Sequence, residues 1–271
     1  MKKLSILICH IQDRQAQLDK LMACLEKQKT DDVEILVETD AGKDSGGLQI
    51  GAKRNKLLYN ARGKYISYVD DDDRISDGTE HPAYIPSILT AIESGPVFDA
   101  VFDAPDAKIA KLVPHQGPRP EPDCVGITGQ LRFANDPYLF FYHSMKHSID
   151  WWDDKATAPP GKAQYYRTPN HLNPIRREIA MACRFESTSS WSEDHSYGRL
   201  VHKLIRTETT IEHPIYYYVK PCNSFPFHFG APTRPTWTAH WKTPKPPTTS
   251  IRTTFVGSTS IPALIQNTRT N

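Results

Sequence analysis

The 271-residue sequence lacks several features that would have fixed its class at once. No apolar run reaches about 18 residues, so we expect no membrane-spanning helix. The short apolar start is not followed by a small-residue cleavage site, which favours a first strand over a signal peptide. The cysteines are odd in number, scattered and without a CxxC pair, which disfavours a disulfide framework and a zinc site: Cys9, Cys24, Cys124, Cys183 and Cys222. These absences predict a cytoplasmic protein with reduced thiols.

Two nucleotide-binding motifs are also missing. No GxGxxG follows the first apolar stretch, and the glycines between Gly42 and Gly51 lack the spacing of a P-loop. The sequence therefore disfavours NAD and ATP sites. Length and composition are those of one large α/β domain, with or without an appendage, because 38% hydrophobic and 24% charged residues are ordinary for a globular chain.

The order of apolar patterns predicts a doubly wound sheet. Leu4 to His10 reads as a buried strand, and a helical stripe follows from Gln15 to Leu25. Val33 to Thr39 is a second strand, Ile50 to Ala61 a short helix and Tyr65 to Val69 a third strand. This βαβ and αβ order is typical of an α/β fold. Further helices are expected at Tyr84 to Ile92, in a segment ending at Ala182, and at His195 to Ile205. Further strands are expected at Val97 to Phe102 and at Thr209 to Val219. No element is assigned to Ala104 to Asp123.

The third strand runs directly into four carboxylates, Asp70 to Asp73. Adjacent carboxylates repel one another, so a folded cluster of them favours a nearby cation. Asp70 and Asp72 are two residues apart and can face the same side in extended backbone, where they suit Mg²⁺ or Mn²⁺. The alternative is a solvated acidic turn. An EF-hand is excluded, because the alternating ligand pattern is missing and the glycine, Gly78, comes too late.

The stretch from Gly51 to Asp73 resembles the signature G-x-x-R-N-x-x-x-x-x-A-x-G-x-Y-I-x-x-x-D-x-D-D of family 2 glycosyltransferases, which have the GT-A fold. The resemblance covers roughly residues 3 to 219. It implies a Rossmann-like, doubly wound mixed sheet with a nucleotide-binding half at about 1–103 and an acceptor half at about 124–219. Residues 220–271 would be a basic C-terminal extension rich in proline and aromatic residues.

The resemblance also assigns roles to individual residues. Asp70 and Asp72 would form the metal and diphosphate motif, with Asp72 the direct metal ligand and Mn²⁺ or Mg²⁺ the cofactor. Asp194 would be the catalytic base, with Glu193 beside it as a second catalytic carboxylate. By the same resemblance Asp40 would contact uracil or ribose, and Arg54 would lie near the nucleotide. Lys53 would reach a phosphate or else face solvent on its helix. The full set of predicted nucleotide-sugar contacts is His10, Asp40, Lys53, Arg54, Asp70, Asp71 and Asn173. For Glu193 and Asp194, ordinary acidic residues at a helix start are the alternative.

The resulting prediction is a metal-dependent enzyme that moves a sugar from a nucleotide-diphosphate sugar, a UDP-sugar by resemblance, to an acceptor hydroxyl with inversion. A metal ion would neutralise the leaving diphosphate, and a carboxylate would take the acceptor's proton. Two alternatives stay open. One is a nucleotidyltransferase or phosphohydrolase using the same carboxylates, and the other is a non-catalytic module that binds sugar nucleotides.

The acceptor is predicted to be a glycan or DNA. After Glu212 the sequence has no Asp or Glu, but six cations alternate with aromatic residues: Lys220, Arg234, Lys242, Lys245, Arg252 and Arg269. Such a segment can neutralise phosphates and stack on bases of a nucleic acid with a modified-base hydroxyl. Alternatively, because these charges are spaced, the segment packs over the active site or binds an anionic glycan or lipid-linked acceptor.

The salt dependence of DNA binding separates these acceptors. A DNA-binding extension should lose affinity for duplex DNA with a log–log salt slope of roughly −3 to −5, because each neutralised phosphate releases counterions. Changing Arg234, Lys242, Lys245 and Arg252 to Gln should then weaken binding and flatten the slope. Fluorescence titrations from about 50 mM salt upward measure both effects. DNA is excluded as an acceptor if the wild type does not bind it, or if its affinity for DNA changes neither with salt nor with the four substitutions.

Overall fold

The structure is a computed structural model, and it describes residues 2–41, 46–118, 121–133, 136–149, 164–187 and 193–220. All of them belong to the first of two units into which the chain divides, Met1–Phe225. The predicted boundary at residue 219 stays a prediction. The predicted C-terminal extension lies outside the described residues except for Lys220.

The first half of the chain forms three parallel strands with a helix after each of the first two. β1 (Leu4–Ile11) lies between β2 (Val33–Asp40) and β3 (Tyr65–Asp70). Between them come η1 (Gln12–Arg14), α1 (Gln15–Gln28) and α2 (Ile50–Asn60). β1 is buried from Leu4 to His10, which explains its nearly continuous apolar sequence. The predicted βαβ and αβ order is therefore confirmed.

Gly63 lets the turn before β3 pass close to β1. A Cβ at this position would lie 2.4 Å from the backbone nitrogen of Ser5, so no larger residue fits without a shift. Its own N–H donates to Ser5 Oγ at 2.7 Å. The glycine of the signature thus has a packing reason, because it allows β3 to lie beside β1 in register.

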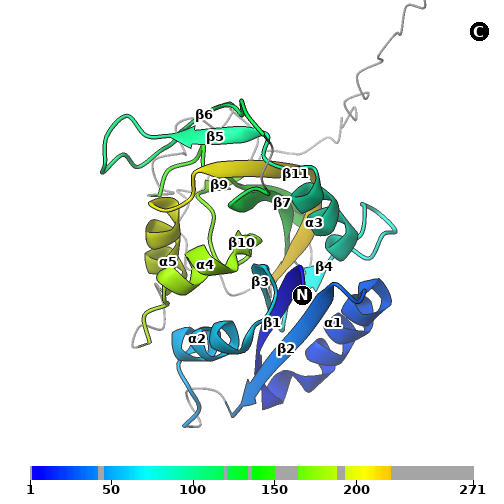
Figure 1. Cartoon of the computed structure of the whole chain (residues 1–271). Helices are drawn as coiled ribbons and strands as arrows, with labels where there is room; N and C mark the ends of the chain where they lie inside the picture. Colours follow the sequence, from blue (N-terminus) through cyan, green and yellow to red (C-terminus); the bar gives the residue numbers. More distant parts are fainter. Residues whose placement is uncertain are drawn as a thin grey trace, which may run out of the picture. The chain divides into compact units, whose positions relative to one another are not determined.

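The sheet continues into the second half of the chain in the order β2-β1-β3-β10-β7-β11-β5-β6. The two-residue strand β10 (Ile175–Arg176) is antiparallel to both β3 and β7 and so joins the two halves (Figure 1). β7 and β11 are parallel to each other. The remaining elements are β4 (Arg74–Ile75), α3 (Tyr84–Glu93), β5 (Phe98–Val101), β6 (Lys111–Pro114), β7 (Cys124–Phe133), β8 (Asp136–His143), β9 (Gln164–Arg167), α4 (Arg177–Ala182), α5 (Glu193–His202) and β11 (Thr207–Lys220).

Two hydrophobic clusters cover the two faces of the sheet. Successive residues of β1 alternate between them, with Ile6 and Ile8 in one and Leu7 and Cys9 in the other. α1 and α3 pack against the first face, and α2, α4 and α5 against the second (Figure 1). This is a mixed α/β sandwich with helices on both sides of one sheet, as predicted.

The bounds of the expected elements agree with the structure to within three residues, but the middle of the chain was not anticipated. No strand was predicted where β7 and its partner β8 lie. β6 lies inside Ala104 to Asp123, to which no element was assigned. In the described part, no helix is long and apolar enough to cross a membrane. The four described cysteines, Cys9, Cys24, Cys124 and Cys183, are free thiols.

Candidate active site

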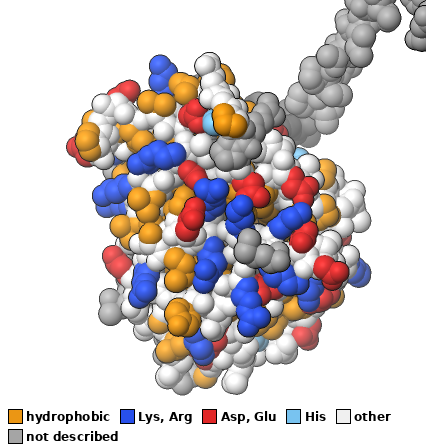
Figure 2. Space-filling view, in the orientation of Figure 1, with side chains coloured by type: hydrophobic (Ala, Val, Ile, Leu, Met, Phe, Trp, Pro, Cys, Tyr) orange, Lys and Arg blue, Asp and Glu red, His pale blue; other side chains and the backbone are white. Residues whose placement is uncertain are grey.

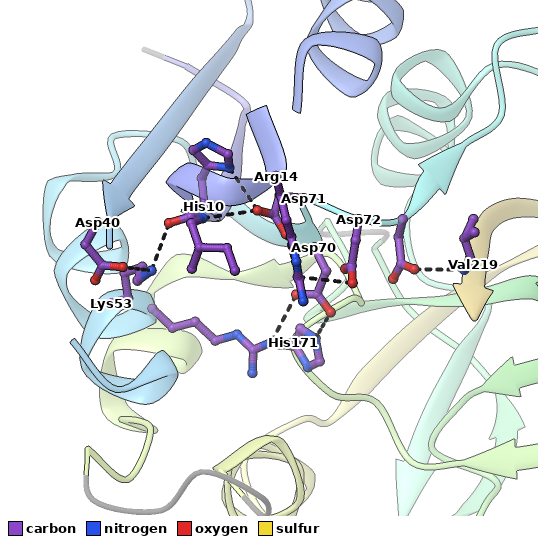
Figure 3. Close-up of polar contacts among 12 residues, drawn as sticks. His10, Arg14, Asp40, Lys53, Asp70, Asp71, Asp72, His171 and Val219 are labelled. Carbon is purple, nitrogen blue, oxygen red and sulfur yellow. Dashed lines mark hydrogen bonds and ion pairs between the residues drawn. The ribbon is translucent and has the colours of Figure 1, made fainter. Parts of the chain in front are cut away.

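The candidate site lies where the three parallel strands end. In the sheet register Cys9 pairs with Asp70 and Ile11 pairs with Asp40, so the carboxyl ends of β1, β2 and β3 meet at one edge. Ligands bind outside this edge in open α/β sheets. Figure 3 shows His10, Asp40 and Asp70 to Asp72 gathered there.

The four consecutive carboxylates alternate between the interior and the surface. Asp71 and Asp73 are 2% and 4% exposed. The side chains of Asp70 and Asp72 are 28% and 33% exposed. This alternation leaves Asp70 and Asp72 as the more exposed pair, within reach of a ligand.

Asp71 anchors the end of β1. One carboxylate oxygen meets His10 Nδ1 at 2.8 Å and accepts from the Ile11 N–H at 3.2 Å. The other accepts from Arg14 at 2.9 Å, and Arg14 also pairs with Asp72 at 3.0 Å (Figure 3). His10 and Asp71 were predicted as nucleotide-sugar contacts. That role stays a prediction, and the structure gives both residues a structural role in joining β1 to the acidic turn.

Asp73 ties the acidic turn to β11. Its carboxylate accepts from the Tyr216 hydroxyl at 2.8 Å and from the Val219 N–H at 2.9 Å. Burial first and then the Asp70 charge raise the pKa of Asp73 well above its ordinary value. The last described residues before the predicted extension are thus held against this turn.

Arg54 joins the acidic turn to α5. Its guanidinium donates to Asp70 Oδ1 at 3.1 Å and to Glu193 Oε1 at 2.7 Å. The side chain is 3% exposed and packs over the rings of Tyr68 and Phe185. Glu193 is 139 residues away in the sequence, so this buried cation brings the predicted metal motif and the predicted catalytic pair together.

Asp194, the predicted base, pairs with Arg167 at 2.8 Å. Burial by itself would raise the pKa of Asp194, but the charges of Arg167 and Arg54 outweigh it and hold that pKa well below its ordinary value. Asp194 is therefore a carboxylate throughout the neutral and mildly acidic range. It is a weaker base than an unpaired carboxylate would be.

Lys53 holds Asp40 at the end of β2. Its ammonium donates to Asp40 Oδ1 at 2.6 Å and to the His10 carbonyl at 2.9 Å, and the residue is 2% exposed. The other Asp40 oxygen accepts from the Leu48 N–H at 2.9 Å. The predicted contacts of Lys53 with a phosphate and of Asp40 with uracil or ribose stay predictions. As folded, Lys53 positions Asp40.

Asn173 is buried below the site. Its amide donates to the Val125 carbonyl at 2.9 Å, and its oxygen accepts from the Asn170 N–H at 3.0 Å and contacts His143 at 3.3 Å. With 1% exposure, it fixes the turn that presents His171. Its predicted contact with the nucleotide sugar stays a prediction. The hydrogen bonds observed for Asn173 hold this turn in place.

The residues present fit a metal ion only together with phosphate oxygens. Among the described residues, no three His, Cys, Asp or Glu side chains form a group that would hold a metal ion. Mg²⁺ and Mn²⁺ are commonly bound by one or two carboxylates plus substrate phosphates, and Asp70 and Asp72 supply such carboxylates. A metal at this site would therefore depend on a bound diphosphate.

Several side chains at the site were not predicted as site residues. Arg14 follows the predicted contact His10 closely in the sequence, and His171 closely precedes Asn173. Their nearness to predicted site residues was therefore a signal for them. Arg167 and Tyr216 gave no signal, because they come from β9 and β11 and reach the site only through the fold. A cavity of about 320 Å³ between Phe102–Ala107 and the end of α5 is lined by none of the candidate site residues.

The described sheet matches the GT-A-like fold of glycosyltransferases. Similar solved structures are S. aureus TarS 1–349 with UDP-GlcNAc (TM-score 0.53, 13% identity) and with UDP (0.51, 14%). Each match covers 80% of this chain and 58% or 60% of the TarS chain, so this chain spans less than two thirds of those structures. No family model matches, and no curated protein matches by sequence.

Adjacent residues Asp71 and Asp72 should differ sharply in their contribution to stability. Asp71→Ala leaves the buried His10 ring and the Ile11 N–H without their acceptor, so we expect a loss of at least about 2 kcal/mol in the free energy of unfolding. Asp72→Ala, at a partly exposed ion pair, should cost less than about 1 kcal/mol. Urea unfolding measures both. Equal losses would mean that the acidic turn is not anchored through Asp71.

Proposed function

We propose that this chain is a glycosyltransferase that moves a sugar from a nucleotide-diphosphate sugar, a UDP-sugar, to an acceptor hydroxyl. The observation that supports this most is the Arg54 bridge, which brings Asp70 and the Glu193–Asp194 pair together at the carboxyl edge of a GT-A-like sheet. UDP and UDP-GlcNAc bound to the similar TarS structures make UDP-sugars the first donors to test.

The donor's diphosphate would lie beside Asp70 and Asp72. These two carboxylates would hold Mn²⁺ or Mg²⁺ together with phosphate oxygens, and the ion would neutralise the leaving diphosphate as a Lewis acid. Arg14 contacts both Asp71 and Asp72 and has a side chain that is 40% exposed, so its guanidinium can also reach a phosphate oxygen. Asp40, held by Lys53, would face the nucleoside at the end of β2.

The acceptor's hydroxyl would lose its proton to Asp194. As the hydroxyl oxygen bonds to the anomeric carbon, the bond from that carbon to the diphosphate oxygen breaks and the nucleoside diphosphate leaves with its electrons. Attack from the face opposite the leaving group inverts the anomeric centre. Arg167 keeps Asp194 ionised, so protonation of Asp194 should not slow transfer as pH falls from about 8 to about 5.

The acceptor we propose first is a glycan. On the face drawn in Figure 2, Lys and Arg alternate with Asp and Glu over the described residues, which is not the single-sign surface expected for a polyanion. The nucleic-acid alternative depends on the C-terminal extension, outside the described residues. A nucleotidyltransferase or phosphohydrolase would use the same carboxylates but would break a different bond.

The metal assignment predicts that UDP binds more tightly with Mn²⁺ or Mg²⁺ than in EDTA, because the ion links the diphosphate to Asp72. Asp72→Ala should remove that difference while leaving the protein folded. Isothermal titration calorimetry with UDP, in each metal and in EDTA, measures it. The matched control is Asp106→Asn, at an exposed position away from this edge. A wild type whose UDP affinity is the same in EDTA as in either metal, or an Asp72→Ala variant that keeps the full gain from metal, would contradict the assignment.

The base assignment predicts a separation of binding from chemistry. Asp194→Asn should bind the donor within about twofold of the wild type, since the proton acceptor acts on the other substrate. Transfer should be at least about 100-fold slower, the scale of losing a general base. Donor affinity comes from calorimetry and the transfer rate from product analysis with an acceptor that the wild type uses. Transfer by Asp194→Asn at the wild-type rate would mean that Asp194 is only an acidic residue at the start of a helix and not the base.

A further inference from the structure

His171 occupies a fixed place in the turn between β9 and β10. Its carbonyl accepts from the Tyr68 N–H at 3.0 Å, and its ring stands edge-on to Tyr68 with centroids 6.3 Å apart. The next residue, Leu172, donates its N–H to Asn170 Oδ1 at 3.0 Å. The backbone of this turn is therefore held without any help from the imidazole nitrogens.

Both nitrogens of the His171 ring are buried and make no hydrogen bond, and the residue is 3% exposed. A buried polar group without a partner costs free energy, and most buried polar groups in folded proteins have one. Two such atoms on one ring at the edge of a candidate active site indicate that a ligand supplies the missing partners.

The surroundings of the ring define what that ligand is. Nε2 lies 3.8 Å from Asp70 Oδ2, too far for a hydrogen bond (Figure 3). The charges of Arg54 and Asp194 also act on the ring. His171 thus lies near both the carboxylate proposed for the diphosphate and the carboxylate proposed for the acceptor. In a glycosyl transfer, the group between those two is the donor sugar.

The chemistry of the ring also suits a sugar hydroxyl. A neutral imidazole has one N–H donor and one acceptor nitrogen. A hydroxyl group both donates and accepts, whereas a phosphate oxygen would use the N–H alone.

We propose that His171 binds the donor sugar, with its ring nitrogens hydrogen-bonded to sugar hydroxyl groups. The inference rests on the proposed function and adds a residue that recognises the sugar itself. It makes His171 a determinant of donor choice, separate from the groups that hold the nucleotide.

The test compares UDP with UDP-GlcNAc, UDP-glucose and UDP-galactose by calorimetry on the full chain. His171→Phe keeps a planar ring against Tyr68 but removes both nitrogens. We expect its affinity for the UDP-sugar that the wild type binds best to fall roughly tenfold, while its affinity for UDP stays within about twofold. His171→Gln, which can still donate and accept, should recover part of the loss.

The control is His213→Phe, whose ring contacts Ser87 Oγ at 3.0 Å and none of the site residues. It should bind UDP and the UDP-sugars as the wild type does, and urea unfolding confirms that each variant is folded. An equal loss for UDP and UDP-sugar in His171→Phe, or no loss for either, would overturn the inference. A wild type that binds none of these nucleotides would instead overturn the proposed function.

Discussion

The arrangement of the site depends on one buried cation. The Arg54 guanidinium is almost wholly removed from water and donates to Asp70 from β3 and to Glu193 from α5. A buried charge is tolerated only when its partners are in place, so the end of β3 and α5 must come together for Arg54 to be stable. The same constraint sets Asp194, the next residue of α5, beside the acidic turn. In this sense the position of the proposed base follows from the burial of Arg54.

The acidic turn shows how four adjacent carboxylates can be accommodated in one folded site. Alternate side chains point inward, where Asp71 meets His10 and Arg14 and Asp73 meets Tyr216 and the Val219 N–H. The inward pair anchors β1 and β11 to the end of β3. The outward pair, Asp70 and Asp72, is left partly exposed for ligands. Structural and ligand-facing roles therefore alternate along four residues of identical chemistry.

The sequence predicted the local parts of this site well, because β1, α2 and β3 are contiguous patterns with strong periodicity. It also singled out Asp70 and Asp72 from their spacing, and these are the two partly exposed carboxylates of the turn. It did not predict β7, β8 or β10, since β10 has two residues and Tyr216 and Arg167 reach the site only through long-range pairing. For Lys53, Asp71 and Asn173 the predicted ligand contacts stay predictions, and nothing in the sequence pointed to their protein partners Asp40, His10 and Val125. Side-chain partners across a fold are not encoded in any local pattern.

Identifying which bond of the donor is broken is the most direct test of the proposed activity. The protein would be incubated with UDP-GlcNAc and the other UDP-sugars, with Mn²⁺ and with a mixture of glycan acceptors, and the nucleotide products would be identified by ³¹P NMR and chromatography. Sugar transfer through the Asp70 and Asp194 site predicts UDP as the nucleotide product, with the sugar on the acceptor or on water. UMP together with a sugar phosphate would show cleavage inside the diphosphate and would contradict the account.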